Sequence, residues 1–265
     1  MRIEVLSDHP AAQLRGTDAA IARTQSQVAG HAQAVDALRR RQRASRRWWQ
    51  LGLWIRHARE LQALLRQAPA VDTSALHRRA QQQAGVDAEE RVTHDLQRSL
   101  PGDWTLFRGY ANRRGEVDHL LVGPFGVWAI EVKGRGVRVH VSGDEWWFEK
   151  FDRYGNLVET GALADRRGRS WGRQVSEIAA DLEKFLRSRG ANVPVHTAVV
   201  VMHDRAGVGR CQGMGVDALS VGTPYLLEQV RRRAGNLDRA TQDKIVNLVR
   251  RDHNFHASRR PGRRG

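Results

Sequence analysis

The segment from Glu116 to Lys133, EVDHLLVGPFGVWAIEVK, constrains the fold more than any other part of the chain. It holds two runs rich in aliphatic and β-branched residues, separated by the turn-forming sequence GPFG. This pattern predicts two antiparallel strands joined by a short loop. If the loop is centred between Pro124 and Phe125, opposing residues have numbers that sum to 249, so Asp118 faces Glu131. A three-residue or bulged loop would shift this register by one.

Alternation with a period of two places four charged residues on one face of these strands: Glu116, Asp118, Glu131 and Lys133. The other strand residues are almost all apolar on both faces, which is typical of strands covered on both sides. Two opposed carboxylates in such surroundings repel each other and resist desolvation. A divalent cation bound between them would remove this conflict.

The residue types indicate which metal this would be. Carboxylate oxygens with no cysteine or histidine cluster nearby favour Mg²⁺ or Mn²⁺ over zinc. Lys133 lies two residues beyond Glu131 on the same face and could orient an attacking water. The spacing alone leaves a second interpretation open, in which Glu131 and Lys133 form an ordinary ion pair on an exposed strand and Asp118 is a turn or cap residue.

The run GEVDHLLVGPFGVWAIEVKGRG resembles the nuclease-related domain, or NERD, family, a branch of the PD-(D/E)xK nuclease superfamily. The resemblance covers roughly residues 84–221. The family pattern of glutamate, one residue and then aspartate is met by Glu116 and Asp118. Its apolar strand ending in E-x-K is met by residues 130–133, IEVK.

Two further family positions lie on predicted helices. Glu89 best matches an upstream glutamate of the family, and Glu90 is a close competitor. Gln174 matches a glutamine on a downstream helix. The family often has a proline just before that glutamine, whereas residues 171–173 are Trp, Gly and Arg in this chain.

The resemblance implies an α/β, restriction-endonuclease-like fold with a central mixed β-sheet flanked by helices, and Mg²⁺-dependent phosphodiesterase chemistry. It also implies roles for single residues. Lys133 would be the catalytic lysine and Gln174 a substrate-positioning group. The implied metal ligands are Asp118, Glu131, the carbonyl of Val132, and Glu89 as an additional metal or water ligand.

Hydrophobic periodicity outlines the remaining elements. We expect strands within residues 116–148, at 195–203 and at 216–221, and a glycine- and arginine-rich loop at 155–172. We expect one or two helices within 17–67, a helix at 84–100, an amphipathic helix at 173–189, and a helix starting near Pro224. The order of these elements predicts an α/β core of mixed sheet topology.

The charge distribution predicts three regions. Of the 44 basic and 29 acidic residues, a helical N-terminal extension (1–80) carries 14 and 6, and a nuclease-like domain (81–222) carries 19 of each. A C-terminal region of helices and a basic tail (223–265) carries 11 and 4. The basic ends therefore predict salt-sensitive attachment to a polyanion, while the central domain is neutral.

Several side chains are candidates for contact with nucleic acid. Arg166, Arg167, Arg169 and Arg173 predict a phosphate-contacting edge, although simple solvation explains them equally well. Trp146, Trp147 and Phe148 could stack on bases, but we expect core packing for at least one of them. His119 alternates away from Asp118, so we expect a packed or hydrogen-bonded histidine.

The stretch RRWWQLGLWIRHARELQALLR combines tryptophan, leucine and arginine within the N-terminal extension. It predicts a helix that packs on its own domain or forms a coiled coil, and the coiled coil would give a homo-oligomer. The alternative is a basic helix lying in a membrane interface, which gives peripheral membrane contact.

These observations favour a metal-dependent nuclease that hydrolyses phosphodiester bonds of nucleic acid, with DNA expected from superfamily habit. The alternative is a non-catalytic nucleic-acid-binding or membrane-adjacent adaptor that retains the nuclease fold. Cys211 is the single cysteine, so no intramolecular disulfide can form, and a reducing, cytoplasmic location is expected. The N-terminus, MRIEVLSDHPAAQ, does not have the uninterrupted apolar stretch of a signal peptide.

Overall fold

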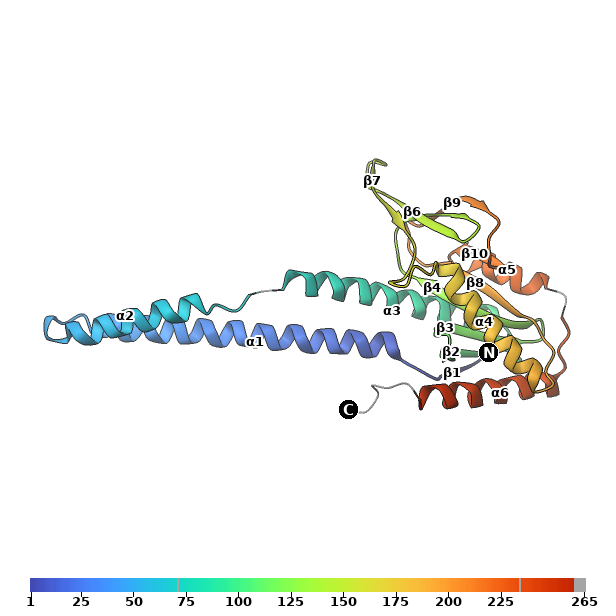
Figure 1. Ribbon diagram of the computed structural model, residues 1–265, viewed down its shortest axis with the longest axis horizontal. Helices are drawn as coiled ribbons and strands as arrows, with labels where there is room; N and C mark the ends of the chain where they lie inside the picture. Colours follow the sequence, from blue (N-terminus) through green and yellow to red (C-terminus); the bar gives the residue numbers. More distant parts are fainter. Residues whose placement is uncertain (71, 234, 260–265) are drawn as a thin grey trace. The chain divides into compact units, whose positions relative to one another are not determined.

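The computed structural model describes residues 1–70, 72–233 and 235–259 (Figure 1). The chain divides into two compact units. The helical unit is Ala11–Gln83, and the sheet unit combines Met1–Pro10 with Ala84–Gly265. None of the described helices has the length and apolar character that crossing a membrane requires.

The helical unit is built on two long helices. α1 (His9–Ala44) and α2 (Leu51–Arg66) lie side by side and antiparallel, joined through the 3₁₀ helix η1 (Trp48–Gln50) (Figure 1). His31 Nε2 lies 2.8 Å from the carbonyl oxygen of Leu64, and Ser45 Oγ lies 3.2 Å from Nδ1 of His57. The expectation of one or two helices within residues 17–67 is confirmed, and the number is two.

In the sheet unit, the described residues form a six-stranded sheet of order β1-β2-β3-β4-β8-β10. The strands are β1 (Arg2–Val5), β2 (Thr105–Ala111), β3 (Glu116–Gly123), β4 (Gly126–Lys133), β8 (Val195–Val201) and β10 (Ala218–Val221). β2, β3 and β4 are antiparallel, whereas β1 joins β2 in parallel and β8 joins both β4 and β10 in parallel. The sheet is therefore mixed, as predicted.

The predicted register of the β3–β4 hairpin is confirmed. The paired residues run from Gly123–Gly126 to His119–Ile130, and every pair sums to 249. This ladder ends one pair short of Asp118 and Glu131, so these two residues lie where the strands separate.

The expectation that alternation continues through Asp118 is wrong. Val117 lies in the same hydrophobic core as Leu120, although they are three positions apart. The cause lies in the neighbouring strand, where Gly109 adopts a positive φ of 71° and interrupts the β2–β3 ladder opposite Asp118. A Cβ at Gly109 would overlap the carbonyl oxygen of Ser7, just after β1, so only glycine fits there.

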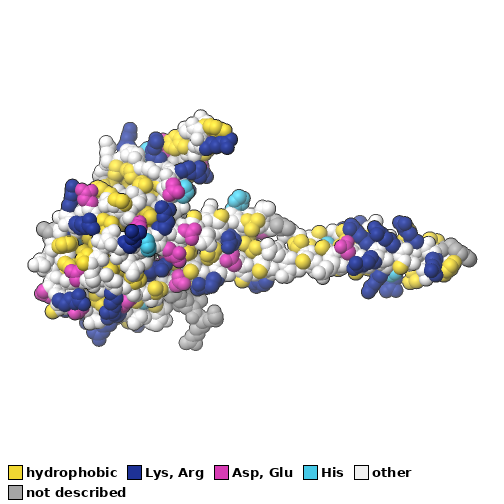
Figure 2. All heavy atoms as spheres, turned by 180° about the vertical axis from the view of Figure 1, so that it is seen from behind, with side chains coloured by type: hydrophobic (Ala, Val, Ile, Leu, Met, Phe, Trp, Pro, Cys, Tyr) yellow, Lys and Arg dark blue, Asp and Glu magenta, His cyan; other side chains and the backbone are white. Residues whose placement is uncertain are grey.

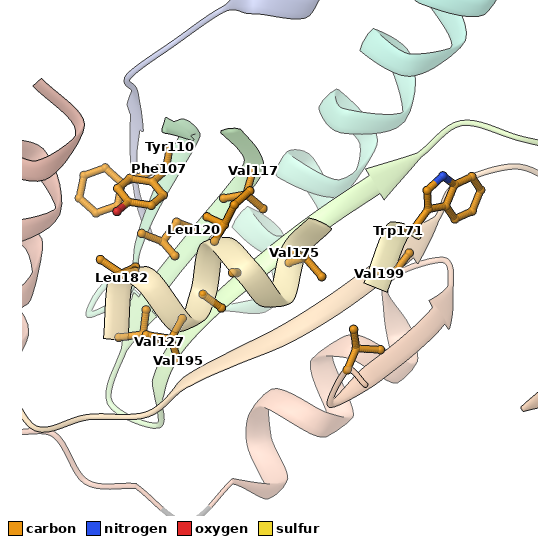
Figure 3. Close-up of a cluster of buried hydrophobic side chains, with 14 of the residues drawn as sticks. Phe107, Tyr110, Val117, Leu120, Val127, Trp171, Val175, Leu182, Val195 and Val199 are labelled. Atoms are coloured by element: carbon orange, nitrogen blue, oxygen red, sulfur yellow. The ribbon is translucent and has the colours of Figure 1, made fainter. Parts of the chain in front are cut away.

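Helices cover both faces of the sheet. α4 (Trp171–Ser188) and α6 (Arg239–Ala257) pack on one face, and α3 (Thr73–Ser99) and α5 (Pro224–Arg232) pack on the other. Figure 3 shows the core on the α4 side of the sheet, in which Leu182 of α4 lies close to Val127 and Val195 of the sheet. α3 begins 11 residues before the predicted start at Ala84, because residues 73–83 are polar helix formers that show no apolar stripe.

A second sheet takes three of its strands from the segment between β4 and α4 and its fourth from the segment after β8. Its order is β7-β6-β5-β9, with β5 (Arg138–Ser142), β6 (Glu145–Phe151), β7 (Leu157–Ala162) and β9 (Gly207–Gln212). Trp146 and Phe148 are buried in the same core as α4, as expected, and Trp147 stacks on His140. The loop predicted at 155–172 is wrong where β7 forms, because this exposed edge strand has no alternating pattern and depends on pairing with β6.

The chain ends differ from the predicted regions. β1 pairs with β2, so residues 1–10 lie in the sheet unit and not in the N-terminal extension. α6 contributes Ile245 and Val249 to the same core as α4 and ends at Ala257. From Arg260 onward, the expected basic tail lies outside the described residues.

Candidate active site

Four charged residues meet where β3 and β4 separate. We call Glu89, Asp118, Glu131 and Lys133 the carboxylate–lysine cluster. They come from α3, β3 and β4, and each of the three elements is fixed by a hydrophobic core on at least one side. Electrostatic interactions connect all four side chains. The structure therefore brings together residues that lie up to 44 positions apart in the sequence (133 minus 89).

Asp118 replaces a ladder hydrogen bond with its own side chain. Its Oδ2 accepts the backbone N–H of Val132 at 2.6 Å, beyond the end of the β3–β4 ladder. The N–H and C=O of one strand residue point to the same side, so the Val132 carbonyl also faces the strand that carries Asp118. This arrangement leaves a carboxylate and a carbonyl oxygen at the same gap in the sheet.

Glu131 and Lys133 form a short ion pair. Lys133 Nζ donates to Glu131 Oε1 at 2.5 Å, and Nζ also lies 5.7 Å from the centre of the Trp171 ring. Burial opposes the charge of Lys133, but Glu131 and Asp118 outweigh it and raise the pKa of the ammonium. Lys133 is therefore a stable positive charge among three carboxylates.

The carboxylates themselves are strained electrostatically. Burial, followed by repulsion from Glu131, raises the pKa of Asp118 well above its ordinary value. Burial also raises the pKa of Glu89 to about 7, with repulsion from Glu131 added and attraction to Arg108 opposing it. Full ionisation of this site at neutral pH is therefore unfavourable without an additional positive charge.

The donor set fits a hard divalent cation. Glu131 is only 6% exposed, and its Oε2 is buried with no hydrogen-bond partner among the described residues. A cation would satisfy that oxygen and relieve the repulsion between the acids. In the described chain no three His, Cys, Asp or Glu side chains are close enough together to hold a metal as they stand, and Lys133 occupies the other oxygen of Glu131.

The structure also separates Glu89 from its competitor. Ala88 and Val92 bury one face of α3 against the sheet, and Glu89 is half-buried beside that face. Glu90 is exposed. Burial raises the pKa of Glu89, and repulsion from the acids of β3 and β4 adds to this rise.

Gln174 and the arginines lie around the first turn of α4. The side-chain amide of Gln174 donates to the carbonyl oxygen of Arg169 at 2.9 Å, so this amide group holds the preceding loop. Arg169 pairs with Asp165 and Glu177, and Arg173 pairs with Glu177. Arg166 and Arg167 are exposed. Arg169 therefore holds the loop to α4, whereas Arg166, Arg167 and Arg173 are exposed, and Arg173 pairs within α4.

His119 is packed and hydrogen-bonded, as expected. It is fully buried, and its Nε2 lies 2.7 Å from Thr93 Oγ1 on α3. Burial lowers its pKa to about 3, so the ring is neutral. His119 ties β3 to the helix that carries Glu89.

Two residues of this site escaped the sequence reasoning. Arg108 on β2 attracts Glu89, and Trp171 lies over Lys133. A signal was present for Arg108, since it is the only charged residue in the apolar strand TLFRGYA. In the sequence, Trp171 was noted only because it belongs to the segment before Gln174 that differs from the family pattern.

The sequence model of the NERD family, the nuclease-related domain, matches residues 84–202. The match begins five residues before Glu89 and contains β2, β3, β4, the inserted strands β5 to β7, α4 and β8. No curated protein and no solved structure matches the chain. The mixed sheet with helices on both faces is consistent with a nuclease-like fold and with the PD-(D/E)xK superfamily. Residues 84–202, a little under half of this chain, therefore match the nuclease-related domain of the NERD family.

Proposed function

We propose that the chain is a metal-dependent nuclease that hydrolyses phosphodiester bonds of nucleic acid. DNA is the expected substrate, and Mg²⁺ or Mn²⁺ is the expected metal. The observation that supports this most is the carboxylate–lysine cluster at the gap between β3 and β4, inside a nuclease-related domain. A buried carboxylate oxygen without a hydrogen-bond partner, next to two acids with raised pKa values, destabilises the fold. The same three acids are well suited to bind a metal ion.

In this proposal Asp118, Glu131 and the Val132 carbonyl hold the metal, with Glu89 as a further ligand for metal or water. The bound metal would lower the pKa of a water and stabilise charge on the phosphate in the transition state. Lys133 keeps its proton, so its ammonium can donate to the attacking water or to a phosphate oxygen. Glu89 can take up or release a proton near neutral pH, because its pKa is about 7.

The exposed Arg166, Arg167 and Arg173 would contact the phosphate backbone, while Arg169 holds the loop that carries the first two. Gln174 would position substrate from the first turn of α4, with its amide nitrogen anchored to the loop. The single free cysteine, Cys211, is exposed and suits a reducing, cytoplasmic environment.

The direct test is cleavage by the purified full-length chain. Supercoiled plasmid, linear duplex, single-stranded DNA and RNA would each be incubated with Mg²⁺, Mn²⁺ or EDTA. We expect cutting of at least one substrate with metal, none in EDTA, and none by Asp118→Asn. Glu90→Gln is the matched control for Glu89→Gln, since Glu90 is adjacent but exposed. Absence of cutting on all four substrates with both metals would contradict the proposal.

A non-catalytic adaptor is the second candidate, and the Lys133–Glu131 ion pair favours it. In an adaptor this pair would be a permanent structural contact, with no metal displacing Lys133 from Glu131. The outcome that supports the adaptor is binding of nucleic acid in EDTA, unchanged by Mg²⁺, together with no cleavage. Metal titration by calorimetry separates the two cases, because only the nuclease requires a metal site that disappears in Asp118→Asn.

A further inference from the structure

The turn between α1 and α2 exposes a group of large apolar side chains. Trp49, Leu51, Leu53 and Ile55 are 61%, 62%, 48% and 40% exposed. We call residues 46–55 the hairpin tip. Trp54 and Leu61 are half-buried on the face of α2 that packs within the hairpin, so the exposed residues are a separate set on the outside of the turn.

The same end of the hairpin is strongly basic. Residues 37–59 contain eight arginines and no aspartate or glutamate. The guanidinium of Arg47 lies 5.6 Å from the centre of the Trp49 ring, which places a cation directly beside an exposed indole. Figure 2 shows basic side chains gathered toward this end of the helical unit, with hydrophobic atoms at its extremity.

We propose that the hairpin tip docks on the surface of an anionic phospholipid bilayer. Leu51, Leu53 and Ile55 would enter the boundary between headgroups and acyl chains, and the indole of Trp49 would lie at headgroup level. The arginines would contact lipid phosphates, because their long stems allow the charge to remain at the headgroups while the apolar residues go deeper. The helical unit is in this view an arm that attaches the nuclease-related domain to a membrane surface.

Nucleic acid explains the arginines but not the apolar residues. A base can stack on Trp49, whereas the aliphatic side chains of Leu51, Leu53 and Ile55 offer no ring for stacking and no donor for phosphate. They would remain exposed on a bound strand.

A second copy of the chain explains the apolar residues but not the charge. Two tips packed together would bring the eight arginines of residues 37–59 close to the same eight of the second copy, and no carboxylate lies between Asp36 and Glu60 to pair with them. A coiled coil would need an apolar stripe along the helices, and these four residues are confined to seven positions at the turn.

Flotation of the full-length chain with vesicles tests the proposal. The probes are vesicles of phosphatidylcholine alone and of phosphatidylcholine mixed with phosphatidylglycerol. We expect flotation with the mixed vesicles in about 0.05 M NaCl, little with phosphatidylcholine alone, and a strong decrease in about 0.5 M NaCl as the charges are screened.

Matched variants separate the tip from general charge. Leu51→Glu with Leu53→Glu should weaken vesicle binding by at least about tenfold, because apolar side chains that would be buried become charged. Leu65→Glu with Leu76→Glu makes the same charge change at exposed leucines outside the tip and should leave binding within about twofold. Arg46→Gln with Arg47→Gln should weaken binding, in contrast to Arg23→Gln with Arg66→Gln. All these residues are exposed, and circular dichroism checks that helicity is kept.

Three outcomes would overturn the proposal. The first is no flotation of wild type with the anionic vesicles, and the second is equal loss in the tip and control variants. The third is that the tip variant abolishes self-association, measured by analytical ultracentrifugation, or DNA binding, measured by anisotropy, without changing flotation. The nuclease proposal is tested separately, because the tip variants should cut plasmid in solution as wild type does.

Discussion

The carboxylate of Asp118 accepts the backbone N–H of Val132 at 2.6 Å, at the point where β3 and β4 stop pairing. One side chain therefore does two things. It satisfies a backbone donor that has lost its strand partner, and it places an ionisable carboxyl group beside Glu131 and Glu89. The two roles can be separated by mutation.

Asp118→Asn keeps an oxygen that can accept the Val132 N–H and removes the charge. We expect metal-dependent cleavage to fall by at least about 100-fold, which is the scale for loss of a key electrostatic group in a transition state. In EDTA the free energy of unfolding should not decrease, because repulsion among the acids is relieved. Asp118→Ala should lose activity too but should also lose about 1–3 kcal/mol of stability, since the N–H is left unsatisfied. Urea unfolding of both variants measures this difference, and equal stability of the two would contradict it.

Glu89 predicts an unusual dependence of stability on pH. Its folded pKa of about 7 lies above the ordinary value of 4.5, so the folded state binds the proton more tightly than the unfolded state. The stability that protonated Glu89 contributes is fully present below pH 4.5 and is lost as the pH rises through about 7. Over this range the free energy of unfolding should fall by roughly 1–3 kcal/mol. In EDTA, Glu89→Gln should flatten the fall in unfolding free energy between pH 5 and pH 8, whereas the exposed Glu90→Gln should not. Asp118 shifts in the same direction, so part of the slope should persist in Glu89→Gln.

Lys133 and Glu131 predict non-additive effects. Lys133→Met should abolish activity and lower the free energy of unfolding by about 2–4 kcal/mol, because it leaves the buried Glu131 without its cation. Adding Glu131→Gln should restore most of that stability without restoring activity. A double-mutant cycle by urea unfolding measures the coupling. Additive losses would mean that the ion pair contributes little to stability.

The arginines near α4 predict a division between binding and stability. Arg166→Gln with Arg167→Gln should weaken nucleic-acid binding similarly for all sequences and reduce the salt slope by about 1–2, with an unchanged Tm. Arg169→Gln should instead lower the Tm, because Arg169 pairs with Asp165 and Glu177. Fluorescence anisotropy across a salt series and thermal melts of the same samples compare the two. A binding loss confined to Arg169→Gln would reverse the assignment.

The sequence was sufficient for the hairpin register, because loop length and apolar alternation are local properties. It could not show that alternation breaks at Asp118. That break depends on Gly109 and on the N-terminal strand β1, because Ser7, just after β1, lies against Gly109. Short strands such as β1 and β7 escaped for the same reason, since they are stabilised by partners and not by a pattern of their own.

The site shows the same limit. The residue types in the carboxylate–lysine cluster could be predicted from spacing and family resemblance. The choice between Glu89 and Glu90 could not, because adjacent helix positions differ by about 100° in direction and only the packing of Ala88 and Val92 decides which one faces the sheet. Trp171 reaches Lys133 only because the chain returns from the second sheet to the place where it left.

That return has a consequence for how such a chain can change. The inserted strands begin just after Lys133 and end just before Trp171, and the ammonium of the one lies 5.7 Å from the ring of the other. The segment that contains β5 to β7 therefore leaves the domain and rejoins it at the same place. We expect changes in the length or charge of its exposed β6–β7 hairpin to leave Lys133 and Trp171 in place, because both lie outside that hairpin.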